Sequence, residues 1–170
     1  MIKKNNYLFW ITGLPGSGKT TIAKKIHNKI KKKYGPTIEI SGDELRTNFV
    51  LNKYDINSRK EYAKFYSYFC KLLIEKEINV LISTVSLFHS VQAWNRKNIN
   101  GYFEIFIKSN VENIIKLNKK KIYKNKKNIV GVNINAEFPK KPDLKIENNF
   151  DKSIDEISNE LFAKIAKKLK

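Results

Sequence analysis

Short apolar runs alternate along the chain with longer segments in which apolar residues recur every three or four positions. The runs of strand length are 7–11, 37–41, 79–83, 103–108 and 142–146. The segments with helical spacing are 20–33, 57–77, 88–98, 111–117 and 154–169. The fourth of these continues into a lysine-dense stretch that ends near Asn128. Strands alternating with helices predict an α/β fold, in which a parallel sheet is covered on both faces.

Length and cysteine content add limits to this fold. The chain has 170 residues, 41% of them hydrophobic, which suits a single domain over residues 1–170. Its one cysteine, Cys70, excludes a disulfide framework, and its aromatic helical surroundings predict a core position. The first apolar run is too short for a signal peptide, and no later segment is long enough to span a membrane. We therefore expect a cytoplasmic protein without a membrane partner.

The segment from Gly13 to Thr20 reads Gly-Leu-Pro-Gly-Ser-Gly-Lys-Thr and fits the phosphate-loop pattern G-x-x-x-x-G-K-[ST]. It follows the first predicted strand and opens the first predicted helix, which is the context the pattern needs. The sequence therefore predicts a three-layer P-loop fold that binds ATP with Mg²⁺. The alternative is a glycine-rich turn that matches by chance.

Each part of the predicted loop has a role in this reading. Lys19 would reach the β- and γ-phosphates, and the Thr20 hydroxyl would ligate Mg²⁺. Backbone N–H groups and the positive end of the following helix would hold the phosphate oxygens. The candidate ATP-binding residues are Gly13, Leu14, Pro15, Gly16, Ser17, Gly18, Lys19, Thr20 and Thr21.

The formal net charge of +18 raises the question of nucleic-acid binding. The basic excess is almost all lysine, and Asn, Ile, Tyr and Phe, whose codons are AT-rich, are abundant beside it. Coding bias and a solvated lysine surface explain much of this charge. A basic nucleic-acid-binding ATPase stays open as an alternative of another class, but no aromatic-basic recognition motif accompanies the charge.

Further motifs narrow the family. They are the segments 10–20, 41–46, 85–88 and 137–144, together with Trp94 and Arg96. In this order, over about residues 8–146, they resemble the adenylyl-sulfate kinase family. The resemblance implies transfer of the ATP γ-phosphate to the 3′-hydroxyl of a nucleotide, adenosine 5′-phosphosulfate, with Mg²⁺. It also suggests a homodimer.

The resemblance assigns roles to individual residues. Asp43 would accept or orient the 3′-hydroxyl proton and contribute to the metal site; the alternative is that it caps a helix beginning there. Arg46 and Arg59 would bind the 5′-phosphoryl group of the acceptor; the alternative is a surface ion pair. Ser86 would lie on the substrate side. Lys120 matches a lysine in a lid at about 116–130, where it would neutralise the transferring phosphoryl group; the alternative is an ordinary lysine of a lysine-rich helix.

Departures from the family bear on the acceptor. Ser41 stands where the family has the first aspartate of Asp-Gly-Asp, and Lys64-Phe65 replaces an arginine pair. Two family phenylalanines sandwich the adenine, and they correspond here to Tyr54 and Ile129. Since an aromatic wall contributes roughly 1–3 kcal/mol of base stacking, Ile129 weakens a purine site. This combination looks like a sub-lineage that acts on cytidine diphosphoramidate in bacterial capsule phosphoramidate synthesis. The alternative is an adenylyl-sulfate kinase that makes 3′-phosphoadenylyl sulfate.

Overall fold

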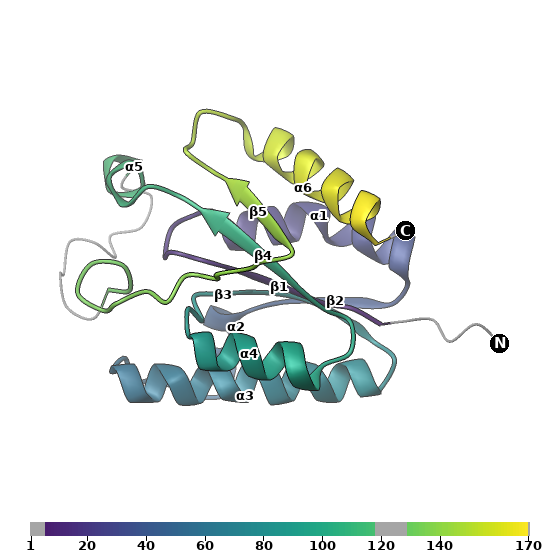
Figure 1. Ribbon diagram of the computed structural model, residues 1–170, viewed down its shortest axis with the longest axis horizontal. Helices are drawn as coiled ribbons and strands as arrows, with labels where there is room; N and C mark the ends of the chain where they lie inside the picture. Colours follow the sequence, from purple (N-terminus) through teal and green to yellow (C-terminus); the bar gives the residue numbers. More distant parts are fainter. Residues whose placement is uncertain (1–5, 118–128, 170) are drawn as a thin grey trace.

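Five parallel strands form one sheet in the computed structural model, which describes residues 6–117 and 129–169 (Figure 1). The strands are β1 (Leu8–Gly13), β2 (Thr37–Ser41), β3 (Asn79–Thr84), β4 (Tyr102–Lys108) and β5 (Leu144–Glu147). Their order across the sheet is β2-β3-β1-β4-β5, and every neighbouring pair is parallel. The first strand of the chain therefore lies at the centre of the sheet.

Helices cover the sheet on both sides. They are α1 (Lys19–Tyr34), α2 (Gly42–Asn48), α3 (Ile56–Glu75), α4 (His89–Asn98), α5 (Val111–Leu117) and α6 (Ile154–Lys168). In Figure 1, α1 and α6 lie on one side of the sheet, and α3 and α4 lie on the other, with α2 beside them. The expected α/β three-layer fold is confirmed.

The central position of β1 explains why Leu8 to Ile11 form a continuous apolar run. All six residues of β1 are buried, since both of its faces are covered. Phe9 and Ile11 belong to the core beneath α1 and α6, whereas Leu8 and Trp10 belong to the core beneath α2, α3 and α4. Burying a side chain of this size contributes about 1.5–3 kcal/mol, so β1 anchors both layers.

The carboxyl ends of three strands meet at one edge of the sheet. Thr12 of β1 pairs in register with Thr84 of β3, and Ser83 of β3 pairs with Ser41 of β2. The phosphate loop leaves β1 at this edge, and α2 begins there at the end of β2. Ligands bind at such edges in open parallel sheets.

Two local features differ from expectation. Ser41 caps α2, because its Oγ accepts from Glu44 N at 3.1 Å while the Glu44 carboxylate accepts from Ser41 N at 2.7 Å. The alternative in which Asp43 caps this helix is therefore wrong. The last strand begins at Leu144 and not at Pro142, because proline has no N–H to donate and the Asp143 carboxylate accepts from Glu104 N at 2.8 Å.

Cys70 lies fully buried on α3, and burial raises the pKa of its thiol, which confirms a core role. Within residues 6–117 and 129–169, no helix is long and apolar enough to cross a membrane. Lys120, and with it residues 118–128 of the expected lid, lies outside the described residues.

Candidate active site

Two glycines give the phosphate loop its shape. Gly13 has φ 154°, and a Cβ there would lie 2.4 Å from the carbonyl oxygen of Ile107 on β4. Gly18, at the N-terminus of α1, has φ 85°, and a Cβ there would lie 2.9 Å from Asn148 Nδ2. Both positions have a backbone angle that favours glycine, and at Gly13 the close backbone carbonyl also leaves no room for a side chain. The loop can therefore turn tightly and present its amides at the start of α1.

Lys19 lies over this loop. Its Nζ donates to the carbonyl oxygen of Leu14 at 2.6 Å and to Ser17 Oγ at 3.3 Å, and the residue is buried. Asn148, which follows β5, donates from Nδ2 to the carbonyl oxygen of Ser17 at 3.0 Å. Hydrogen bonds from Lys19 and from Asn148 thus fix the conformation of the loop. Asn148 was not predicted from the sequence as a site residue.

A cavity of about 630 Å³ joins the phosphate loop to the end of β2 and the start of α3. The predicted site residues that line it are Pro15, Gly16, Gly18, Lys19, Thr20, Thr21, Asp43, Arg46, Tyr54, Arg59, Ser86 and Ile129. Gly13, Leu14 and Ser17 shape the loop without lining this cavity. This cavity therefore brings most of the predicted ATP residues together with the predicted acceptor residues, while Lys120 lies outside the described residues.

Asp43 and Arg46 form an ion pair at the acceptor end of the cavity. Arg46 Nη2 lies 3.0 Å from Asp43 Oδ1, and the Asp43 carboxylate is largely exposed. The Arg46 Nε atom is buried and has no hydrogen-bond partner within the described part of the chain. The ion-pair alternative for Arg46 is thus observed, and Arg46 faces the cavity as well.

Two guanidinium groups lie over the ring of Tyr54. Those of Arg46 and Arg59 lie 4.8 and 5.5 Å from the ring centroid, and Arg59 Nε donates to the carbonyl oxygen of Tyr54 at 2.8 Å. Burial, followed by repulsion from Arg46, lowers the pKa of Arg59. This end of the cavity is therefore suited to a phosphoryl group.

Several cavity residues were not expected from the sequence. They are Tyr62, Tyr66, Ser83, Thr84, Val85, Phe88, Val130, Phe150 and Ile154. The Tyr66 hydroxyl donates to the carbonyl oxygen of Gly42 at 3.1 Å, and burial raises its pKa to about 12, so it stays a neutral donor. Tyr62 and Tyr66 lie four residues apart on α3, a spacing that places both on one helix face.

Hydroxyl groups line the floor of the cavity at the end of β3. Thr20 Oγ1 lies 3.1 Å from Ser83 Oγ, and Thr84 Oγ1 lies 2.8 Å from Ser86 Oγ. Ser86, which the resemblance assigned to the substrate side, is thus held by its neighbour on the strand end.

A second cavity, of about 780 Å³, lies beyond Leu14 and is lined by β4, the start of α5 and residues 131–142. It is larger, but Leu14 is the one phosphate-loop residue in its lining, and it includes none of Asp43, Arg46 and Arg59. The smaller cavity is therefore the candidate active site, because it alone of the two combines the phosphate loop with the charged acceptor residues.

Known proteins resemble the chain over nearly its whole length. A protein of Campylobacter jejuni subsp. jejuni serotype O:2 named cytidine diphosphoramidate kinase is 35% identical over 170 residues, 97% of this chain and 99% of that protein. The adenylyl-sulfate kinase of Gloeothece citriformis is 25% identical over 170 residues, 96% of each. The structure of the Mycobacterium tuberculosis APS kinase in complex with AMPPNP and APS has a TM-score of 0.81 and 26% identity, covering 95% of this chain and 98% of that one.

The family model described as adenylylsulphate kinase matches residues 5–147. This range contains the phosphate loop and all the predicted acceptor residues, so the resemblance carried by the motifs is confirmed. The chain therefore belongs to the adenylylsulphate kinase family and is an ATP-dependent kinase.

Proposed function

We propose that the chain transfers the γ-phosphate of ATP to the 3′-hydroxyl of cytidine diphosphoramidate, as a step of capsule phosphoramidate synthesis. The observation that carries this proposal is the single cavity in which the phosphate loop meets Asp43, Arg46 and Arg59, with an aliphatic Ile129 in its wall. The 35% identity to the C. jejuni protein of that name supports the choice of acceptor.

On the donor side, Lys19 would turn from the Leu14 carbonyl oxygen and the Ser17 hydroxyl to the β- and γ-phosphates of ATP. Mg²⁺ fits the oxygen donors present, because Thr20 and Asp43 line the same cavity and this ion takes one or two protein oxygens besides water and phosphate. When bound, Mg²⁺ would neutralise charge on the phosphates. Thr20 and Asp43 would hold it.

On the acceptor side, phosphoryl transfer depends mainly on in-line positioning and charge neutralisation. Arg46 and Arg59, which meet at Tyr54, would bind the two phosphoryl-type groups at the 5′ end of the acceptor. Asp43 would then accept the 3′-hydroxyl proton or orient that hydroxyl. Ser86 would contact the acceptor, and Lys120 would act from a lid at about 116–130.

The base is the part of the acceptor that separates the two candidate activities. Tyr54 and Ile129 both line the cavity, so one of the two proposed base walls is aromatic and the other aliphatic. A pyrimidine needs less stacking surface than a purine, which favours cytidine over adenosine 5′-phosphosulfate. The adenylyl-sulfate kinase activity stays the second candidate because most relatives named here carry it.

The organisation of the protein is part of the same proposal. We place one kinase domain over residues 1–170, acting in the cytoplasm as a homodimer. Two exposed apolar side chains four residues apart on α3, Tyr68 and Leu72, support a self-association surface. Sedimentation of the purified protein would measure its oligomeric state.

A coupled ADP-release assay tests the acceptor. Cytidine diphosphoramidate should give a higher kcat/KM than adenosine 5′-phosphosulfate, and the 3′-deoxy form of either should give no turnover. Efficient turnover of adenosine 5′-phosphosulfate with none of the cytidine compound would establish the second candidate instead. Phosphate found on the 2′-hydroxyl or the 5′-terminal group of the product would contradict the role given to Asp43.

A further inference from the structure

Ser83 lies at the carboxyl end of β3, in register between Ile11 of β1 and Ser41 of β2. The residue is 3% exposed, and it lines the active-site cavity. Its Oγ lies 3.1 Å from Thr20 Oγ1, so the strand end contacts the first turn of α1 through two hydroxyl groups.

The direction of this hydrogen bond is open in the structure, because either hydroxyl can donate. Binding of a cation by Thr20 would fix it. A Thr20 oxygen that gives a lone pair to the cation keeps its proton, and that proton needs an acceptor. The Ser83 oxygen is in place to accept this hydrogen bond, and the Ser83 hydroxyl hydrogen can then point toward water in the cavity.

The neighbouring hydroxyl groups at the ends of β3 and β2, those of Thr84 and Ser41, are engaged in other hydrogen bonds. In P-loop proteins an aspartate from another strand commonly helps the loop Ser or Thr to hold Mg²⁺. Here the residues at the end of β3 are Ser83 and Thr84, and Thr84 Oγ1 is engaged with Ser86 Oγ at 2.8 Å. The Ser41 hydroxyl is engaged in the cap of α2.

We propose that Ser83 is a positioning residue of the magnesium site: its Oγ accepts a hydrogen bond from the Thr20 hydroxyl and thereby orients the Thr20 oxygen toward Mg²⁺. This inference rests on the proposed use of Mg²⁺ with ATP, and it does not depend on the acceptor. Groups that orient a metal ligand typically change metal affinity by about 10–100-fold. A hydroxyl acting through a hydroxyl belongs at the lower end of that range.

The test measures ADP binding by calorimetry with EDTA and with saturating Mg²⁺. Ser83→Ala should leave the ADP affinity in EDTA unchanged and reduce the gain in affinity on adding Mg²⁺ by about tenfold. Ser83→Cys, which keeps a side chain of similar shape but a weak acceptor, should behave in the same way. Ser67→Ala, at a buried serine on α3 that does not line the cavity, serves as the matched control.

A double-mutant cycle with Thr20→Ala separates positioning from packing. If Ser83 acts through Thr20, Ser83→Ala should cause no further change in the Mg²⁺-dependent ADP affinity of the Thr20→Ala variant. The inference would be overturned if Mg²⁺ raised the ADP affinity of both Ser83 variants as much as that of the unmodified protein. It would also be overturned if the variants lost as much ADP affinity in EDTA as in Mg²⁺, or if the effects in the cycle were additive. Absence of any Mg²⁺ gain in the unmodified protein would instead contradict the proposed cofactor.

Discussion

At the scale of single residues, the motif residues were predictable and the aromatic lining was not. Asp43 and Arg46 follow a strand end directly, so their place at the cavity follows from the topology of a parallel sheet. Tyr66 and Phe150 reach the same cavity from α3 and from the segment before α6. Their positions depend on how those segments pack on the sheet, and a local sequence pattern does not predict that packing.

Lys19 supplies the clearest test of the donor site. Its Nζ donates to Leu14 and Ser17 within the phosphate loop, so Lys19→Ala should leave the apolar core and the fold intact while lowering kcat by about 10²–10³-fold. The control is Lys32→Ala, an exposed lysine on the same helix. Steady-state kinetics with the unfolding midpoint would measure both effects, and near-normal turnover of Lys19→Ala would contradict the phosphate-loop reading.

Ile129 is the residue on which acceptor choice should depend. It is buried, and its backbone N donates to Asn133 Oδ1 at 2.8 Å, so it forms part of a fixed wall. Ile129→Phe would restore a second stacking face and should shift the ratio of kcat/KM values toward adenosine 5′-phosphosulfate by about tenfold, roughly 1.4 kcal/mol.

The control for this prediction is Ile129→Leu, which alters shape without adding an aromatic ring. The KM for ATP should stay constant in both variants, because the change lies at the acceptor base. A ratio that moves equally in Ile129→Leu and Ile129→Phe would indicate altered packing, and would count against base stacking at this wall.

At the scale of elements, the strands and long helices followed from the apolar pattern, since buried parallel strands and amphipathic helices have different periods. The short helix α2 was expected only in the alternative in which Asp43 caps a helix there, because seven residues carry too little periodicity to predict it. Its start was nevertheless encoded in Ser41 and Glu44, three residues apart, as a capping box. The cap holds α2 at the strand end, and Asp43 lies in its first turn.

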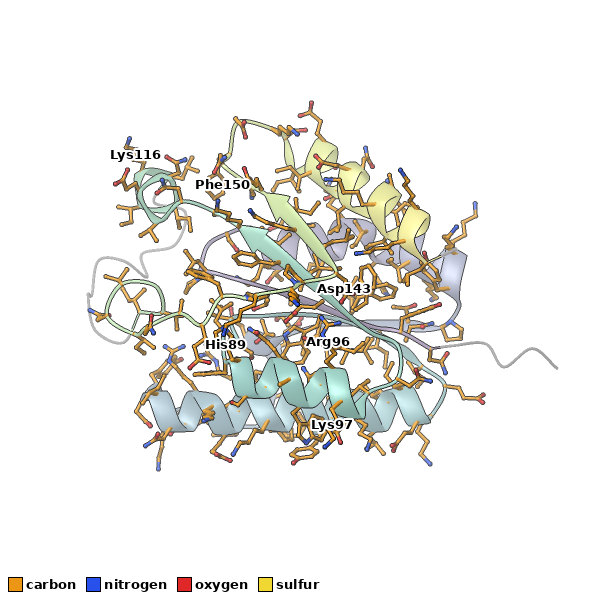
Figure 2. All side chains as sticks on the ribbon, viewed as in Figure 1. His89, Arg96, Lys97, Lys116, Asp143 and Phe150 are labelled. Atoms are coloured by element: carbon orange, nitrogen blue, oxygen red, sulfur yellow. The ribbon has the colours of Figure 1, made fainter. Side chains whose placement is uncertain are left out.

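An ion-pair network around the buried Glu104 connects α4, β4 and the residue that precedes β5. Arg96 Nη2 of α4 lies 3.2 Å from Glu104 Oε2 and 3.1 Å from Asp143 Oδ2, and Figure 2 shows Arg96 and Asp143 facing each other across the edge of the sheet. The Tyr102 hydroxyl donates to Glu104 Oε1 at 3.0 Å. Despite these partners, burial raises the pKa of Glu104 above its ordinary value of 4.5.

The raised pKa has a consequence for stability. The folded protein binds the Glu104 proton more tightly than the unfolded chain, so this contribution to the unfolding free energy is full below pH 4.5 and is lost as the pH rises through the folded pKa. Glu104→Gln cannot titrate. Urea unfolding from pH 4 to pH 8 should therefore show that the unfolding free energy of the variant rises relative to that of the unmodified protein as the pH increases. A difference in unfolding free energy that does not change with pH would contradict the raised pKa.

At the scale of the whole molecule, the exposed lysines of the described residues lie on both sides of the sheet. Exposed lysines lie on α1 and α6 on one side and on α3 on the other, for example Lys32, Lys167 and Lys60. Several others are paired with carboxylates, as Lys25 is with Asp155 at 2.8 Å. A nucleic-acid site normally gathers its cations on one face or along one helix. The distribution favours a solvated surface.

This distribution leads to a prediction about polyanions. A net charge of +18 will attract duplex or single-stranded nucleic acid at low salt, through counterion release alone. Binding that rests on six or more phosphate contacts loses about 10³–10⁵ in affinity between 50 and 200 mM salt, so it should vanish near physiological salt. Fluorescence anisotropy with oligonucleotides over that range would measure it, with ATP turnover recorded in parallel. Sequence-selective binding that survives 200 mM salt, together with nucleic-acid-stimulated ATPase activity, would show that the charge has a function beyond the nucleotide cavity.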